Sequence, residues 1–280
     1  MGYDLHVHSI YSDGTLKPAV LVAKAMAKGL NGLALTDHDT IAGLPEATLA
    51  ARELKLTFIP GVELTTDYGD KEVHVLGYNF LDQGNQLAKK LETVIASRND
   101  RARLIIKKLN QHSIPLTWEQ VQAQTTSNFV GRTHIFRALE NARLIPKEHS
   151  WGAFNYYLGK NGVAYVPHQE LGTREAIDLI NNTQGISVLA HPGRMGEDAL
   201  IRELIDFGLQ GIEIFYPAHT PEMVAHYLKV AADFKLIVTG GSDYHGAFSH
   251  TKMGDAQVPE VSEWFEPKKT GVPAHEFFKI

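Results

Sequence analysis

The sequence of 280 residues contains no cysteine. Disulfide bonds, zinc–thiolate sites, iron–sulfur clusters and thiol nucleophiles are therefore excluded. No apolar run reaches the roughly 18 residues that a membrane span requires; the best stretch, residues 18–27, is interrupted by Lys24. The N-terminus carries Asp4, His6 and His8 where a signal peptide would need apolar residues. We therefore expect a cytoplasmic protein that has no membrane partner.

Positive charge is also scarce, because 27 Lys and Arg residues stand against 32 Asp and Glu residues, a formal net charge of −5. Proteins that grip long nucleic acid by charge alone are usually basic, so no long duplex is expected as a partner. No feature indicates an obligate protein partner. Histidine, in contrast, is abundant, with 14 residues against 10 Tyr and 12 Phe. In a chain without cysteine this excess points to a metal held by nitrogen and oxygen.

Short apolar strands alternate with helical stretches in the first and last parts of the chain. The pattern predicts strands at residues 3–7, 32–35, 57–60, 72–78, 186–190, 211–215 and 236–239. It predicts helices at residues 17–28, 44–54, 174–182, 197–207 and 221–234. Seven strands joined by helices favour a parallel α/β architecture that closes into a barrel or a distorted barrel.

A long stretch of different character separates the fourth and fifth predicted strands. Residues 87–111 predict one long basic helix, and residues 118–124 and 133–142 predict shorter ones. We interpret residues 81–164 as a helical insertion on the rim of a barrel formed by residues 1–80 and 165–280. Such an insertion would cap the face where the barrel loops gather. Residues 251–280, which are rich in proline, predict a tail that wraps around the barrel.

Histidines and acids stand at or near the ends of these strands. His6 and His8 are two positions apart on a strand, so both imidazoles point to the same face. In a barrel the carboxyl ends of the strands share one face, which is where active sites lie. The residues that converge there are His6, His8, Asp13, His38, Glu63, His74, His191, Asp243 and His245.

Six histidines and three acids brought together would destabilise the fold unless cations neutralised them. Nine ligands exceed what one ion needs, so the pattern predicts two or three divalent ions that share a carboxylate and a water. A set of nitrogen and oxygen ligands without sulfur suits Mn²⁺, Zn²⁺ or Fe²⁺.

The charge of such a site narrows the substrate. Three divalent ions, three carboxylates and one bridging hydroxide leave a net charge of roughly +2, which suits an anionic substrate. Paired ions also stabilise the attacking and leaving oxygens of a phosphoryl displacement. Arg194 lies close after His191, and Arg132 stands at the apparent start of an insertion helix, where backbone N–H groups also favour phosphate.

Five segments resemble the motifs of the PHP (polymerase and histidinol phosphatase) superfamily of metallophosphoesterases. They are Asp4-Leu5-His6-Val7-His8-Ser9, Thr36-Asp37-His38-Asp39-Thr40, Pro60-Gly61-Val62-Glu63, Ala190-His191-Pro192-Gly193 and Gly241-Ser242-Asp243-Tyr244-His245. The insertion resembles the bacterial branch of RNase AM and the 3′,5′-nucleoside-bisphosphate phosphatases. That finer similarity rests on Arg98-Asn99-Asp100-Arg101, Arg132-Thr133-His134-Ile135-Phe136-Arg137 and Tyr165-Val166-Pro167.

The resemblance implies a distorted (β/α)7 barrel with up to three ions, most commonly Mn²⁺. It implies a first ion held by His6, His8, Glu63 and Asp243, a second by Asp13, His38 and His245, and a third by Glu63, His74 and His191. Glu63, Asp243 and His38 are the predicted catalytic residues, and Asp37 is expected to orient its neighbours. The predicted substrate contacts are Arg132, His134, Arg194, Arg98, Asn99 and Arg101. His219 has no counterpart in the motifs of the superfamily.

Four functions compete at this point. The first is a phosphomonoesterase that removes the 3′-phosphate of nucleoside 3′,5′-bisphosphates, such as 3′-phospho-AMP, by attack of a metal-bridged hydroxide on phosphorus. This first candidate includes a second activity as an alternative, that of a 5′→3′ exonuclease on short RNA. The second is a phosphatase of another small phosphomonoester, such as histidinol phosphate. The third is a hydrolase of C–N bonds, which the extra arginines disfavour, and the fourth is a metal-binding scaffold without catalysis, which would tolerate eroded ligand motifs.

Overall fold

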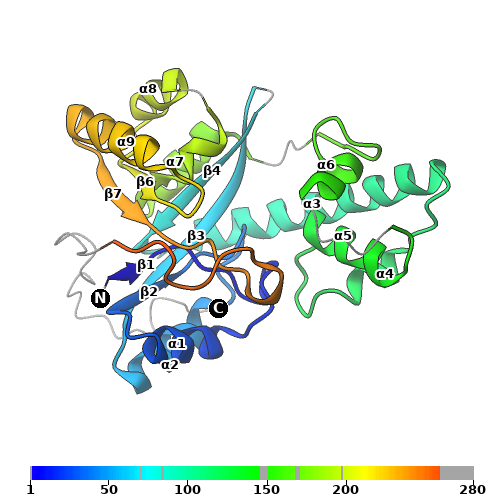
Figure 1. Ribbon diagram of the computed structural model, residues 1–280, viewed down its shortest axis with the longest axis horizontal. Helices are drawn as coiled ribbons and strands as arrows, with labels where there is room; N and C mark the ends of the chain where they lie inside the picture. The colour runs from blue at the N-terminus through cyan, green and yellow to red at the C-terminus, as the bar shows by residue number, and fades with distance from the viewer. Residues whose placement is uncertain are drawn as a thin grey trace.

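Seven strands form one sheet in chain order (Figure 1). The structure is a computed structural model and describes residues 2–69, 71–82, 85–145, 151–167, 171–196 and 198–258. The strands are β1 (Tyr3–Asp4), β2 (Gly32–Leu35), β3 (Thr57–Tyr68), β4 (Lys71–Tyr78), β5 (Ile186–Leu189), β6 (Gly211–Phe215) and β7 (Ile237–Gly240).

The sheet is mixed. Strands β1 to β3 are parallel, and so are β5 to β7, but β4 is antiparallel to both of its neighbours. The prediction that all strands run parallel was therefore wrong for β4. Two residues of sequence connect Tyr68 to Lys71, and such a short connection permits a hairpin but not the crossover that a parallel pair needs.

Two strand boundaries differ from those predicted. The strand predicted at residues 57–60 continues to Tyr68, so Glu63 lies within β3 and not in a loop after it. The strand predicted at residues 3–7 is shorter, although Val7 still forms a parallel bridge with Tyr244. The extension of β3 is what makes the β3–β4 hairpin long enough to reach the rim of the barrel.

The first and last strands lie side by side and nearly close the sheet into a barrel. The backbone N–H of Leu5 donates to the carbonyl of Gly240 at 3.1 Å, and that of His8 donates to the carbonyl of Tyr244 at 3.0 Å. The predicted barrel is therefore confirmed. Its interior is filled by side chains from several strands, among them Leu5, Ala34, Ile59, Leu76 and Val188.

Helices cover the barrel on two sides (Figure 1). The pair α1 (Pro18–Ala27) and α2 (Leu44–Leu54) packs on one side, and α7 (Thr173–Asn182), α8 (Asp198–Asp206) and α9 (Pro221–Phe234) pack on the other. The 3₁₀ turns Pro192–Arg194 and Gly246–Phe248 follow β5 and β7. Among the described residues no helix is long and apolar enough to cross a membrane.

Four further helices stand beside the barrel: α3 (Gln86–Gln111), α4 (Trp118–Gln122), α5 (Arg132–Asn141) and α6 (Trp151–Leu158) (Figure 1). The first half of α3 packs in a barrel cluster through Leu87 and Leu91, whereas its second half packs against α4 to α6 through Ile105 and Leu109. Since α3 belongs to both cores, the division at residues 81 and 164 stays a proposal.

The predicted tail, residues 251–280, lies within the described part of the chain only as far as Val258. That residue returns to the start of the chain, where Tyr3 N–H donates to the Val258 carbonyl at 2.9 Å and Val258 N–H donates to the Tyr3 carbonyl at 3.1 Å. Residues 259–280 lie outside the described residues.

Closure of the barrel depends on a glycine. A Cβ atom at Gly241 would fall against the backbone nitrogen and Cβ of His6. We therefore expect Gly241→Ala to lower the free energy of unfolding by about 1–3 kcal/mol through overpacking, measured by urea titration. Gly172→Ala is the control, because a Cβ there meets no atom within 4 Å. Equal effects of both substitutions would contradict the proposed contact.

Candidate metal centre

The segment after β1 turns two histidines toward each other. Leu5 and Val7 are buried in hydrophobic clusters, and His6 and His8, at the alternate positions, are fully buried as well. Side chains of an extended chain alternate between its two faces, so the two imidazoles share a face. Their ring centroids are 5.1 Å apart.

A first group of ligand candidates surrounds these histidines. His6 Nε2 is 3.1 Å from Glu63 Oε2 and 3.5 Å from Asp243 Oδ1. His8 Nε2 is 3.2 Å from each of the same two oxygens. One ligand atom from each of the four residues lies within 4.8 Å of the others. Since ions such as Zn²⁺ sit about 2.0–2.2 Å from nitrogen and oxygen ligands, one ion can contact all four.

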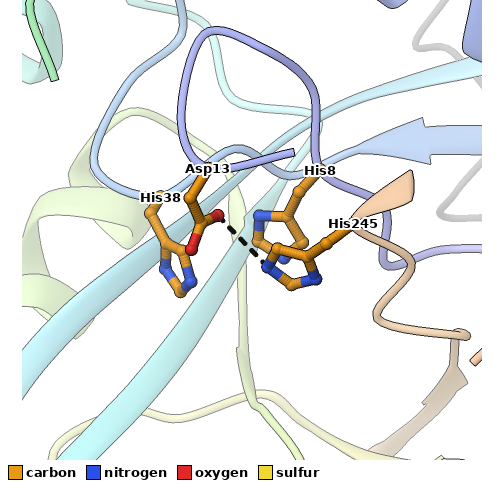
Figure 2. A group of neighbouring side chains, drawn as sticks. All are labelled: His8, Asp13, His38 and His245. Atoms are coloured by element: carbon orange, nitrogen blue, oxygen red, sulfur yellow. Dashed lines mark ion pairs between the residues drawn. The ribbon is translucent and has the colours of Figure 1, made fainter. Parts of the chain in front are cut away.

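A second group consists of His8, Asp13, His38 and His245. Figure 2 shows these side chains gathered beside one another, with the ion pair between Asp13 and His245 marked. Asp13 Oδ1 lies 3.2 Å from His245 Nε2. The His8 ring stacks on the His245 ring with centroids 4.0 Å apart. His8 is therefore shared between the first two groups.

The third group consists of His38, Glu63 and His74. Glu63 Oε1 is 2.7 Å from His74 Nδ1, and Glu63 Oε2 is 3.2 Å from His38 Nδ1. His191 Nε2 lies 3.1 Å from Glu63 Oε1. The structure thus brings all nine predicted ligand residues together, with Glu63 at the centre. The grouping differs from the predicted one in three ways: His8 joins the second group, His38 joins the third, and His191, although it contacts Glu63, belongs to none of the three groups of described residues.

The donor atoms fit divalent ions. Five buried atoms of this cluster have no hydrogen-bond partner within the described part of the chain, namely His6 Nε2, His8 Nδ1, His8 Nε2, Asp13 Oδ1 and Glu63 Oε2. A buried polar atom without a partner is costly, yet Glu63 Oε2 lies 3.1 Å from His6 Nε2 and 3.2 Å from His8 Nε2, and Asp13 Oδ1 lies 3.2 Å from the Nε2 atom of His245. Lone pairs that converge in this way suit a cation held between them, and the absence of sulfur suits Mn²⁺, Zn²⁺ or Fe²⁺.

Comparisons with known proteins agree with this geometry. A model of the PHP domain matches residues 4–114. A 5′-3′ exoribonuclease of Haemophilus influenzae is 36% identical over 257 residues, which are 90% of this chain and 93% of the relative. The solved structure of a protein described as a metal-dependent phosphoesterase from Bifidobacterium adolescentis superposes with a TM-score of 0.85 at 32% identity and covers 93% of each chain. The chain belongs to the PHP family of metal-dependent phosphoesterases.

This assignment confirms the resemblance seen in the sequence motifs. A 3′,5′-nucleoside bisphosphate phosphatase of Chromobacterium violaceum is also similar, with 32% identity over 248 residues and 86% of each chain covered. The similarity to this phosphatase and to the exoribonuclease extends through most of the chain and includes the insertion, whereas the PHP domain model ends at residue 114.

One residue of the PHP site was missed at the sequence level. Glu213 of β6 is fully buried, and its Oε1 lies 3.0 Å from His6 Nδ1. Its Oε2 accepts the backbone N–H of His191 at 2.8 Å. A carboxylate behind a ligand histidine fixes the ring so that the other nitrogen faces the ion. The available signal was an acid at the centre of an otherwise apolar strand, residues 211–215.

Two residues outside the cluster hold its loops. Asp37 accepts hydrogen bonds from the hydroxyls of Ser9 and Ser12, each at 2.6 Å, so it fixes the loop between His8 and Asp13. His219 binds backbone groups through both nitrogens: Nδ1 donates to the Ile214 carbonyl at 2.8 Å, and Nε2 accepts the Gly193 N–H at 3.1 Å. It belongs to none of the three groups of the described residues.

Two of the predicted substrate contacts lie at the edge of the cluster. Arg132 Nη2 donates to both carboxylate oxygens of Glu72, at 2.7 Å each, and Glu72 Oε1 is 3.3 Å from His74 Nε2. The side chain of Arg194 is 41% exposed, with Nη1 3.8 Å from Asp243 Oδ2. Arg194 therefore adjoins a ligand candidate directly, whereas Arg132 is linked to the ligand candidate His74 through Glu72.

The other four predicted contacts are used within the protein. Arg98 Nη1 donates to Asp39 Oδ2 at 2.6 Å, and Asn99 and Arg101 donate to the backbone carbonyls of Asn128 and Val166. His134 is buried and accepts the Gly131 N–H at the start of α5, and its burial lowers its pKa to about 4. Contact of these four residues with substrate stays a prediction.

Metal-stripped protein should hold protons where the ions would bind. Burial opposes a charge on His8, but the carboxylates of Asp243 and Glu63 outweigh it and raise the pKa of His8 to about 10. For His74, Glu63 and Glu72 likewise overcome burial and raise its pKa to about 9. Both rings are then protonated at pH 7, and each must lose a proton before its nitrogen can bind an ion.

We therefore expect Mn²⁺ binding to the stripped protein to release protons at pH 7. Protons and metal compete, so the apparent affinity should rise and the proton release should fall as the pH increases from 7 toward 9. Calorimetric titrations in buffers of different ionisation enthalpy measure both quantities. An affinity that does not change with pH would show that the rings are already neutral.

Proposed function

We propose that this protein removes the 3′-phosphate of nucleoside 3′,5′-bisphosphates, such as 3′-phospho-AMP, and also degrades short RNA from its 5′ end. The observation that carries the proposal is the nine-residue donor cluster centred on Glu63, with Arg132 and Arg194 at its edge. Similarity to a bisphosphate phosphatase and to an exoribonuclease supports a substrate with a nucleotide and more than one phosphate group.

Two or three divalent ions, most commonly Mn²⁺ in this superfamily, would be held by the three groups described above. When bound, such ions supply Lewis-acid activation of a phosphate oxygen and of water near neutral pH. Glu63 would be shared between ions, because its two oxygens face different histidines.

Neighbouring side chains orient the ligand atoms of the site and set their protonation. Asp243 Oδ2 accepts the Tyr216 hydroxyl at 3.1 Å, which leaves Oδ1 facing His6 and His8. Burial and neighbouring positive charge hold the pKa of His38 well below its usual range despite nearby carboxylates, so its ring offers a lone pair to an ion at neutral pH. We assign Glu63, Asp243 and His38 as the catalytic residues on this basis.

The arginines would bind the phosphates. Arg194 adjoins Asp243 and would contact the phosphate that reacts. Arg132 lies on α5 of the insertion and would bind the second phosphate, exchanging its pair with Glu72 for a bidentate contact with phosphate oxygens. A substrate with two phosphates would then be held between the barrel and the insertion.

A substrate screen separates this proposal from its alternatives. Phosphate release by the Mn²⁺-loaded enzyme is compared for 3′-phospho-AMP, histidinol phosphate and short 5′-phosphorylated RNA. Highest kcat/KM on 3′-phospho-AMP supports the bisphosphatase, and highest kcat/KM on histidinol phosphate would replace it by the small phosphomonoesterase. No turnover of any substrate at full metal occupancy would favour the scaffold.

Glu63→Gln tests the shared carboxylate. The amide keeps the shape of the side chain but removes the charge that holds two cations together. We expect loss of at least one ion per chain and of nearly all turnover, with an unchanged circular dichroism spectrum. Elemental analysis and a phosphate-release assay measure the two effects. Normal turnover with a full complement of metal would refute the role of Glu63.

Arg132→Ala tests the second phosphate site. A charge-assisted hydrogen bond contributes about 1.5–3 kcal/mol, so kcat/KM for 3′-phospho-AMP should fall about ten- to a hundredfold. An aryl monophosphate, which lacks a second phosphate, should react almost as in the wild type. Equal losses on both substrates would mean that Arg132 serves the reacting phosphate or the fold.

A further inference from the structure

The insertion holds Asp13, a ligand candidate of the barrel. Asp13 Oδ2 accepts a hydrogen bond from the Thr133 hydroxyl at 2.9 Å, across 120 positions of sequence. The backbone carbonyl of Asp13 accepts a hydrogen bond from the Arg137 guanidinium at 2.6 Å. Thr133 and Arg137 are four positions apart on α5 and so lie on one face of the helix.

The two carboxylate oxygens of Asp13 have different surroundings. Oδ2 is bonded to Thr133, whereas Oδ1 is buried, has no hydrogen-bond partner among the described residues, and lies 3.2 Å from His245 Nε2. The terminal torsion of an aspartate is broad, so a bond to one oxygen sets the direction of the other. Thr133 therefore directs Oδ1 toward His8, His38 and His245, the arrangement drawn in Figure 2.

The loop that carries Asp13 is held from two sides. Asp37 of the barrel binds the hydroxyls of Ser9 and Ser12. From the insertion, the Ser127 hydroxyl donates to the Tyr11 carbonyl at 3.0 Å. The barrel thus holds the loop at Ser9 and Ser12, and the insertion holds it at Tyr11 and at Asp13, the ligand candidate.

We propose that Thr133 is a positioning residue for the ion held by Asp13, His38 and His245, and that α5 thereby sets the affinity of this one ion. The proposal rests on the metal centre of the proposed function. Hydrogen bonds to ligating carboxylates typically change metal affinity 10- to 100-fold. The neighbouring Arg132 turns instead to Glu72, so the first turn of α5 would carry a substrate contact and a metal-positioning contact side by side.

Thr133→Val tests the proposal, because valine keeps the shape of threonine and removes the hydroxyl. Mn²⁺ titrations of the metal-stripped protein, followed by calorimetry and by the electron paramagnetic resonance signal of free Mn²⁺, count the ions and give each affinity. We expect one ion to bind about 10- to 100-fold more weakly, while the others keep wild-type affinity.

Three further variants make the result specific. Thr133→Ser retains the hydroxyl and should restore the affinity to within a few-fold of the wild type. Thr93→Val removes a hydroxyl that, among the described residues, bonds only to the Lys90 carbonyl of its own helix α3, and it should not change the affinity of any ion. In an Asp13→Ala background, Thr133→Val should cause no additional loss, because the residue acts through Asp13.

Wild-type affinities for every ion in a folded Thr133→Val protein would overturn the inference and leave the proposed function standing. Equal weakening of all ions would also overturn it, since that result indicates a general loss of structure. If Thr133→Val does not fold, Thr133→Ala and Thr133→Ser carry the same comparison. A wild-type protein that binds no divalent ion would refute the metal centre, and the inference with it.

Discussion

The buried carboxylate of Glu63 is the constraint on which the rest of the structure depends. It is 1% exposed, and ionising a group at such depth costs several kcal/mol unless it is paired. The residues that pair with it come from four different parts of the barrel and are His6, His8, His38, His74 and His191. The rim of the barrel is arranged so that these imidazoles reach one side chain, and Glu63 can reach them because β3 continues through it.

The insertion contacts the rim of the barrel through hydrophobic packing as well as through polar side chains. One helix, α3, packs in the barrel with its first half and in the insertion with its second half. Between them Arg98 pairs with Asp39, which also accepts the backbone N–H of Thr65 on β3 at 2.9 Å. Arg98 lies over the Phe129 ring at 4.7 Å as well. These contacts make the insertion a continuous support of the rim.

Much of this could be predicted from the sequence, for definite physical reasons. The apolar strands and the helical periodicity could be recognised in the sequence, and each ligand candidate was of a residue type that binds metal ions. The direction of β4 could not be predicted, because the alternation of apolar and polar side chains along a strand is the same in both directions. Pro60-Gly61 also resembled the end of a strand, whereas Gly61 is needed there because a Cβ would lie 2.8 Å from Thr36 Cγ2.

The contacts of the basic helix could not be predicted from the sequence either. Charges at helical spacing in residues 98–108 indicate a polar face, but they do not tell which guanidinium turns inward. The structure buries Arg98 and Arg101 and leaves the side chain of Arg103 53% exposed. The role of Glu213 could not be predicted for a similar reason, since it depends on His6, a residue more than two hundred positions away.

The closure of the barrel has a consequence for synthesis of the chain. Asp4 accepts hydrogen bonds from the backbone and the hydroxyl of Ser242, 238 positions later. Contacts so distant in sequence form late and slowly. A nascent chain exposes His6 and His8 long before Asp243 and His245 have been made, so the cluster is completed only after residue 245 has been synthesised. A divalent ion held by residues from both segments would bind only the closed barrel, and would therefore stabilise that state against opening.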